Sequence, residues 1–211
     1  MSDATLPQPP SQTEPPIRPR FEALRLQSER LWLRPLRESD EAALFAMHSD
    51  PEVMRYWSTP PWTDPQQARD MIAWDAQGLP AGDHLRLALG RHGSDELLGT
   101  CSLFSLLPQC RRAELGYVLA RPAWGQGLMD EALRTLLTWA FEALNLNRLE
   151  ADIDPRNAAS ERALRRLGFQ QEGFLRQRWI VDGVVSDTAL FGLLRSDWDA
   201  QAAGSATRLA R

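Results

Sequence analysis

Two glycines at the start of a helical pattern are the first residues in this sequence that could bind a ligand. Residues 124–127, Trp-Gly-Gln-Gly, follow a strand-like stretch, and paired apolar residues recur from Leu128 onward on one broad helix face. The first N–H groups of a helix lack internal partners, and glycine lets a phosphate approach them closely. The pattern therefore indicates an anion site; an ordinary glycine turn is the alternative.

Two common phosphate-binding motifs do not fit this stretch. A P-loop would need Gly-Lys-Ser or Gly-Lys-Thr, which does not follow here. The dinucleotide fingerprint G-x-G-x-x-G would need a third glycine where Asp130 stands.

A second strand–turn–helix unit follows. Residues 148–153 alternate as a strand does, and residues 154–157 have turn chemistry. Asn157 is a suitable N-cap for a short helix over 158–167. Gly168 is a suitable stop, with Phe169 placed to contact Leu164 in a Schellman-type end.

The remaining elements are predicted from periodicity and from turn residues. The first strand spans 25–35, and the second helix begins at Asp64-Pro65 and ends at Gly78. The other elements are a helix from Ser39 or Asp40 to His48, strands 85–90, 97–106 and 112–119, a helix over 128–144, and strands 174–181 and 184–194 joined at Asp182-Gly183. The order is β-α-α-β-β-β-α-β-α-β-β, which predicts one mixed α/β (α+β) domain.

Composition limits the classes of function. A net charge of −4 over 211 residues gives no general electrostatic reason to bind nucleic acid or an anionic membrane. Two cysteines and three scattered histidines predict no metal site, and no secretory signal or membrane-spanning run is visible, so we expect a cytoplasmic protein. We expect a disordered Pro-rich tail over 1–20, a single domain over 21–198 and a loose tail over 199–211.

Three motifs together resemble one family. They are Glu-Leu-Gly-Tyr-Val-Leu at 114–119, Gly-Gln-Gly at 125–127, and Asn-Ala-Ala-Ser at 157–160 with Leu-Gly-Phe at 167–169. This combination resembles the GNAT superfamily of acetyl-coenzyme A-dependent N-acetyltransferases, most like the Rim-type branch of ribosomal-protein N-terminal acetyltransferases. The likeness covers roughly 28–198. It implies a mixed sheet of about seven strands, splayed between the strand ending near Leu119 and the strand at 149–153, with acetyl-CoA in the gap.

The resemblance also implies how the coenzyme is held. The pyrophosphate cradle falls on Trp124, Gly125, Gln126, Gly127, Leu128 and Met129. The family pattern has Gln or Arg where this chain has Pro122, so one side-chain contact is lost. Asn157 would contact the pantetheine arm, and a backbone N–H at Val118 or Leu119 would polarise the thioester carbonyl.

Catalytic roles are implied for two side chains. Glu114, on the strand beside the splay, would take the proton of the amine; a surface pairing with Arg112 is the alternative. Many family members place a tyrosine acid where this chain has Leu164. Ser160 is then the expected donor to the leaving thiolate, and a helix serine bonded back to a carbonyl is the alternative.

The acceptor side is less well defined by the sequence. Trp57 and Trp62 lie in a loop that would line it, although either could simply anchor the loop. Arg162 and Arg165 could meet the 3′-phosphate of the coenzyme or form a solvated helix face. We expect acetyl transfer to a primary amine, first of all a protein N-terminal α-amine, by a monomer or homodimer. The alternatives are a small amine (antibiotic, polyamine or amino-acid derivative) as acceptor, or a non-catalytic acyl-CoA sensor.

Overall fold

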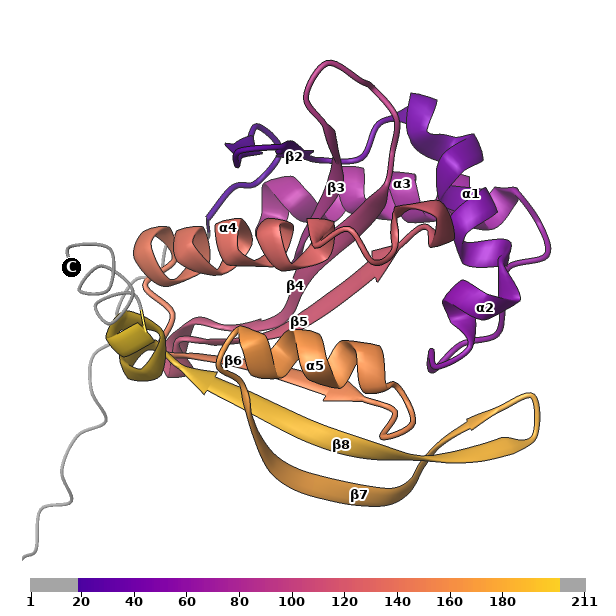
Figure 1. Cartoon of the computed structure of the whole chain (residues 1–211). Helices are drawn as coiled ribbons and strands as arrows, with labels where there is room; N and C mark the ends of the chain where they lie inside the picture. The colour runs from indigo at the N-terminus through magenta and orange to yellow at the C-terminus, as the bar shows by residue number, and fades with distance from the viewer. Residues whose placement is uncertain (1–18, 202–211) are drawn as a thin grey trace, which may run out of the picture.

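A single mixed sheet of eight strands forms the centre of the molecule (Figure 1). The computed structural model describes residues 19–201, so the tails predicted over 1–20 and 199–211 lie almost wholly outside the described residues. The strand order is β1-β2-β3-β4-β5-β6-β8-β7. The strands are β1 (Leu26–Gln27), β2 (Leu31–Arg34), β3 (Leu85–Arg91), β4 (Gly99–Leu107), β5 (Arg112–Leu119), β6 (Arg148–Ile153), β7 (Gln170–Val181) and β8 (Val184–Leu194).

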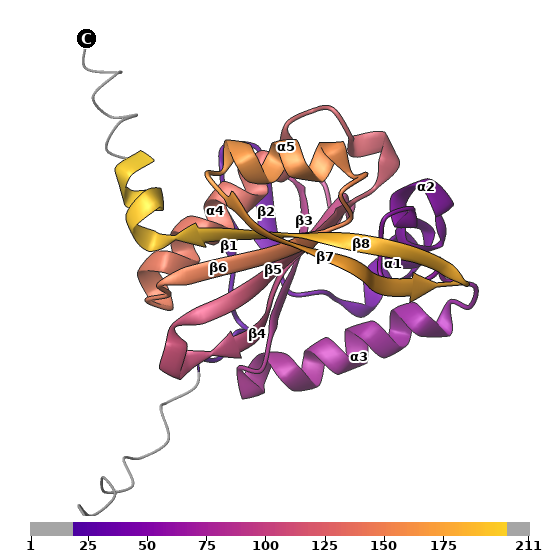
Figure 2. The same ribbon diagram turned by 90° about the horizontal axis from the view of Figure 1, so that it is seen from below.

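Helices cover both faces of the sheet. They are α1 (Glu41–Ser49), α2 (Pro51–Met54), α3 (Gln66–Ala81), α4 (Leu128–Ala143) and α5 (Ala158–Arg166), and residues 195–201 are also helical. Figure 2 shows α3 on one face and α4 and α5 on the other. The predicted mixed α/β architecture is confirmed.

The splay that the resemblance implied lies between β5 and β6. These strands pair in parallel at only three positions, which end at Glu114 opposite Glu150. Beyond that point the strands diverge, whereas β4 stays paired with β5 as far as Leu119 and β8 stays paired with β6 as far as Ile153. A gap therefore opens in the middle of a continuous sheet (Figure 1).

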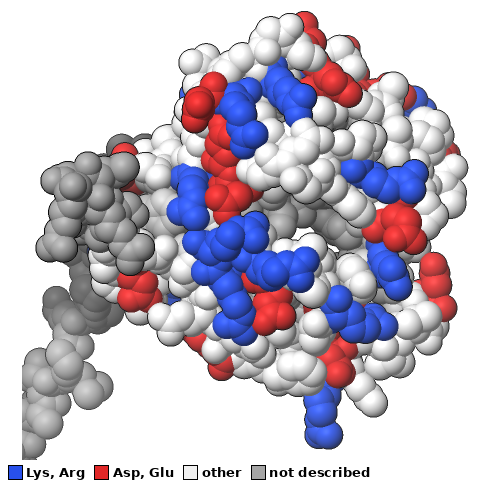
Figure 3. Space-filling model, viewed as in Figure 1, with Lys and Arg blue, Asp and Glu red and all other residues white. Residues whose placement is uncertain are grey.

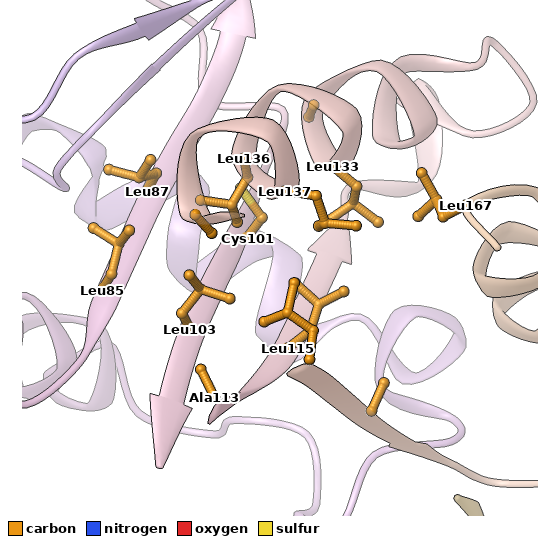
Figure 4. Packing of buried hydrophobic residues seen from close by; sticks show 14 of the residues in the cluster. Leu85, Leu87, Cys101, Leu103, Ala113, Leu115, Leu133, Leu136, Leu137 and Leu167 are labelled. Carbon is orange, nitrogen blue, oxygen red and sulfur yellow. The ribbon is translucent and has the colours of Figure 1, made fainter. Parts of the chain in front are cut away.

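The main core fixes the position of α4 against the sheet. Leu133, Leu136 and Leu137 are fully buried and belong to the same cluster as Leu103 and Leu115 (Figure 4). Burying each leucine side chain contributes about 1.5–3 kcal/mol. A smaller cluster on the opposite face joins α1 and α3 to β3 and β5. Both walls of the gap are thus anchored in packed cores.

The predicted first strand is wrong in one respect: the segment is a hairpin, β1 and β2, which raises the strand number to eight. Its turn is held from far along the chain, because Glu131 on α4 accepts hydrogen bonds from Ser28 Oγ (2.7 Å) and from the N–H of Arg30 (2.7 Å). A contact over such a sequence separation leaves no local pattern.

The predicted end of α3 at Gly78 is also wrong. The helix continues to Ala81 and stops at Gly82, whose φ is 70°. Gly78 lets the His84 ring pack directly against the helix backbone, since a Cβ on it would lie 2.0 Å from that ring.

The other turns behave as predicted. Asn157 Oδ1 caps α5, Phe169 N–H bonds to Leu164 O beyond Gly168, and Asp182 and Gly183 both have positive φ in the β7–β8 turn.

Candidate active site

A cavity of about 250 Å³ passes through the sheet at the splay. Tyr117, Asn157 and Ser160 line it on the face that carries α4 and α5. Arg86 and Asp152 line it on the opposite face, because side chains alternate between the two faces along each strand. One cavity therefore connects the two faces of the sheet where pairing between β5 and β6 has ended.

Two hydroxyl groups meet inside this cavity. Tyr117 Oη lies 2.5 Å from Ser160 Oγ and 3.4 Å from Ser160 O. Among the described residues, Ser160 Oγ forms no bond back to a helix carbonyl, so the alternative reading of Ser160 as a back-bonded helix serine does not hold. The sequence analysis did not single out Tyr117. The pattern that could have indicated it is a hydroxyl-bearing residue on the same buried strand face as Ala113 and Leu115.

Asn157 orders the first turn of α5 beside the cavity. Its Oδ1 accepts a hydrogen bond from the N–H of Ser160 at 3.1 Å, and its side chain also lines the cavity. The capping role is confirmed, and the contact with pantetheine stays a prediction. Leu164, where many family members have tyrosine, is fully buried in the main core.

The predicted cradle lies at the N-terminus of α4. Gly125 and Gly127 have φ values of 72° and 73°, and a Cβ on Gly125 would meet nothing within 4 Å. Trp124 Nε1 donates to Leu119 O at 2.7 Å and so fixes the cradle to the end of β5. Leu128 is buried and Met129 is half-buried against the core, so their side chains hold the helix while their N–H groups are available to a ligand.

Arginine side chains from other segments approach the predicted cradle. Arg30, from the β1–β2 turn, donates to Gln126 O at 3.1 Å and pairs with Glu131. Its Nη2 would lie 3.7 Å from a Cβ on Gly127. A second guanidinium, that of Arg91, bonds the side chain of Gln126. Two cations from distant segments therefore lie beside the glycines, which sequence reasoning missed.

Alternate backbone N–H groups near the end of β5 point toward the splay. The N–H of Ala120 donates to Leu98 O at 2.8 Å, on the β4 side. Because N–H groups point alternately to the two sides of a strand, the N–H of Leu119 points away from β4 and that of Val118 toward it. Of the two predicted polarisers, the geometry favours Leu119.

Two carboxylates lie close to the opening of the splay. Glu114 occupies the last paired position of β5, but it is not among the residues that line the cavity. Its expected alternative partner, Arg112, pairs with Glu150 instead, and among the described residues Glu114 forms no ion pair. Asp152, which the sequence did not single out, does line the cavity, and its exposed carboxylate has no partner in the part of the chain that the structure describes.

Of the two tryptophans predicted to line the site, Trp57 lines the cavity and Trp62 packs against His48. Trp57 lines the cavity, and its ring meets that of His48 edge to face at 6.0 Å between centroids. Trp62 is not among the lining residues and stacks on His48 at 4.3 Å. Trp57 therefore lines the cavity and Trp62 does not, and the role of either residue in binding the acceptor stays a prediction. Burial lowers the pKa of His48 to about 4, so its ring is neutral near pH 7.

Arg86 puts a guanidinium into the cavity on the face opposite α5. Its Nη1 donates to Asp75 Oδ1 at 2.7 Å, and His84 Nε2 lies 2.9 Å from the same oxygen. Burial raises the pKa of Asp75, while Arg86 opposes that shift. The buried carboxylate holds Arg86 in place and leaves its other N–H donors for a ligand.

The basic side chains of this protein, histidine aside, are all arginines. The 24 basic residues are all arginine, and the chain contains no lysine. Figure 3 shows a group of them over α5 and the adjoining part of α4. Arg165 pairs with Glu161 and Arg166 with Asp130, which favours the solvated-face interpretation for this helix; Arg162 is exposed.

Residues 19–201 contain neither a metal-binding cluster nor a membrane-spanning helix. No group of three or more His, Cys, Asp or Glu side chains in that range could hold a metal ion. No helix in that range combines the length and the apolarity that crossing a bilayer requires.

The geometry agrees with comparisons against known proteins. A family model described as the acetyltransferase (GNAT) domain matches residues 30–170, and the chain therefore belongs to the GNAT acetyltransferases. It is 39% identical over 173 residues to the uncharacterized N-acetyltransferase p20 of Bacillus licheniformis, covering 82% of this chain and 97% of that protein.

Two relatives with named acceptors are more distant. The ribosomal protein uS5-alanine N-acetyltransferase of Escherichia coli is 34% identical over 84 residues, which cover 40% of this chain and 43% of that protein. Spermidine N(1)-acetyltransferase of Escherichia coli is 27% identical over 151 residues, with coverages of 72% and 78%. The protein is thus an acetyl-CoA-dependent N-acetyltransferase, and its relatives act on both kinds of amine.

Proposed function

We propose that the acceptor is the α-amine of a protein N-terminus, which attacks the thioester directly at the splay. The observation that carries this proposal is the cavity that joins the two faces of the sheet. Its α5 side holds Tyr117, Asn157 and Ser160 for the acyl end of the coenzyme, and its other side holds Arg86 and Asp152 for the acceptor.

The charges on the acceptor side support a peptide over a polyamine. Asp152 can attract the ammonium of an incoming α-amine, and Arg86 can donate hydrogen bonds to the first peptide carbonyl groups. The same guanidinium would repel the second and third charges of spermidine, because like charges a few ångströms apart cost free energy.

The reaction needs little help to deprotonate such an acceptor. An α-amine has a pKa of about 7.7–8.0, so part of it is neutral near pH 7. It attacks the thioester carbonyl while the N–H of Leu119 stabilises the developing oxyanion. The amine proton leaves through water toward Asp152 or Glu114, and the C–S bond breaks beside Ser160.

A mass-spectrometric acceptor screen with acetyl-CoA tests the proposal. Peptides that begin with Ala, Ser or Met should gain one acetyl group at the α-amine, and spermidine should react at least about tenfold more slowly. Preference for spermidine over every peptide would overturn the assignment of the acceptor. Asp152→Asn should slow the best peptide and leave the affinity for CoA unchanged.

A small amino-acid derivative is the second candidate, because Arg86 could pair with a free carboxylate. Comparing an amino acid with its amide distinguishes the two candidates: loss of activity on amidation would favour the small acceptor, and equal rates would favour the peptide.

A cytoplasmic location belongs to the same proposal. Cys101 and Cys110 are both free, and Cys110 is exposed, which suits a reducing compartment.

A further inference from the structure

The Tyr117–Ser160 contact has a role that the family motif does not specify. We propose that Tyr117 is a positioning residue that turns the Ser160 hydroxyl into the hydrogen-bond donor for the sulfur leaving acetyl-CoA. The inference rests on the proposed binding of the acyl end of the coenzyme in the splay cavity, and it is independent of which amine is the acceptor.

The proposal depends on the direction of the hydrogen bond between the two hydroxyls. In the described part of the chain, the oxygens bonded to Tyr117 Oη are both from Ser160: Oγ at 2.5 Å and the carbonyl at 3.4 Å. The phenol has one proton, which can go to Oγ or to the more distant carbonyl, and at the Oγ contact either oxygen could donate. We assign the Tyr117 O–H to Ser160 Oγ, because that contact is the shorter one and a phenol is a stronger acid than an alcohol. The Ser160 proton is then directed away from Tyr117.

Ser160 has little competing use for that proton. Its Oγ has no other partner among residues 19–201, while its N–H is held by Asn157 Oδ1 at 3.1 Å. Ser160, Asn157 and Tyr117 line the same cavity. The free O–H of Ser160 therefore points toward space that a ligand can enter, and the chain of two hydroxyls strengthens it as a donor.

Tyr117 stays protonated throughout the working range. Burial raises its pKa to about 12, and the hydrogen bond with Ser160 only partly opposes that shift. The phenol is accordingly a permanent donor. Leu164, at the position where many family members have tyrosine, is buried in the core, so the phenol in this cavity comes from β5 and not from α5.

The chemistry balances without a transfer from either hydroxyl. The amine forms the C–N bond, the C–S bond breaks, and the electron pair stays on sulfur. A thiol has an ordinary pKa of about 8.5, below that of both hydroxyls, so Ser160 stabilises the thiolate by donating a hydrogen bond. The proton released by the amine passes through water and neutralises the thiolate after it leaves.

Binding of CoA and of desulfo-CoA, which lacks the sulfur, tests this role without turnover. If Ser160 stabilises the thiolate, the affinity for CoA relative to desulfo-CoA rises between pH 7 and pH 9.5, by about tenfold for each unit by which the bound thiol pKa is lowered. Calorimetry should show that this rise is smaller by about tenfold in Ser160→Ala and in Tyr117→Phe than in the wild type.

Kinetics of a double-mutant cycle test whether Tyr117 acts through Ser160. Each single variant should lower kcat by about tenfold or more, with little change in KM for acetyl-CoA. Tyr117→Phe in the Ser160→Ala background should cause no further loss, because its target is gone. Ser160→Thr, which keeps the hydroxyl, should retain most of the activity, and Thr138→Val, which removes an exposed helix hydroxyl elsewhere, is the control.

The failures are distinguishable. If the wild type binds neither coenzyme analogue, the proposed function falls with the inference. If both bind but the pH-dependent ratio is the same in all variants, only the inference is overturned. Additive losses in kcat would make Tyr117 an independent donor and would also overturn it.

Discussion

At the scale of single residues, two carboxylates compete for the amine proton. Glu114 lies at the last paired position of β5, just outside the cavity, whereas Asp152 lines the cavity on the opposing strand. Neither carboxylate has an ion-pair partner among residues 19–201. Their roles can be separated by the pH dependence of the reaction, because a base matters only while the amine is protonated.

Glu114→Gln keeps the size of the side chain and removes its charge. We expect kcat/KM to fall by roughly ten- to a thousand-fold at neutral pH if Glu114 relays the proton. The loss should shrink as the pH passes the pKa of the amine, about 7.7–8.0 for an α-amine, since a free amine needs no base. Asp152→Asn is the matched comparison, measured as a pH–rate profile on the same peptide.

Two outcomes would contradict the role for Glu114. A profile parallel to that of the wild type would mean that Glu114 only holds the substrate. If kcat/KM is unchanged in Glu114→Gln but shows the predicted pH-dependent loss in Asp152→Asn, then Asp152 and not Glu114 accepts the amine proton.

His48 makes folding stability depend on pH. Burial holds its pKa at about 4, below the ordinary value of 6.5, so between these values the unfolded state binds more protons. The free energy of unfolding should therefore fall as the pH drops, with His48 contributing about 2 kcal/mol of the loss between pH 7 and pH 5. Denaturant unfolding of His48→Phe, which does not titrate there, should show a loss smaller by that amount. An equal loss in both proteins would mean that His48 titrates normally.

At the scale of elements, the start of α4 combines a left-handed backbone with open space. Gly127, the N-cap, has a φ of 73°, and its Cβ position has only ordinary contact with Arg30. The space around Gly127 would therefore admit a side chain, so what favours glycine there in the structure is the positive φ. A role in letting a ligand approach stays a prediction.

Gly127→Val should weaken binding of CoA by at least about 2 kcal/mol, roughly thirty-fold, because a branched side chain fills the cradle. Strain at positive φ would add a loss of stability. Gly93→Val separates the two effects, since Gly93 also has a positive φ, 78°, with open space around it, in the β3–β4 turn. Calorimetry of both folded variants should show weaker binding for Gly127→Val alone. Unchanged affinity of Gly127→Val for CoA would contradict the assignment of the cradle.

Elements and motifs with local signals were predictable, and contacts across the sheet were not. The cap at Asn157 and the turn at Asp182 follow from neighbouring residues, which is why their positions were predicted. Tyr117, Asp152 and Arg86 enter the site from three different strands, and only the splay brings them together. The β1–β2 hairpin was missed for the same reason, since a distant helix residue holds its turn.

At the scale of the whole molecule, the sheet separates the predicted coenzyme side from the proposed acceptor side, and the splay connects the two. The predicted cradle and α5 lie on one face, and α1 and α3 cover the other face, where we propose that the acceptor binds (Figure 2). Because both walls of the gap belong to packed cores, the distance between them is held by elements and not by loops. This arrangement favours attack in a fixed geometry.

The arginine-only set of cations has a consequence for the enzyme's own chemistry. A thioester acetylates neutral amines, so a lysine side chain near it could itself be acetylated. A guanidinium stays protonated and does not attack the thioester. In this 211-residue chain the α-amine at the N-terminus is the sole primary amine. Incubation with acetyl-CoA alone should therefore add at most one acetyl group to the intact mass, and none once that amine is blocked. Further acetyl groups would indicate reaction at a hydroxyl or at Cys110. The protein can hold an acylating agent among many positive charges without becoming its own substrate.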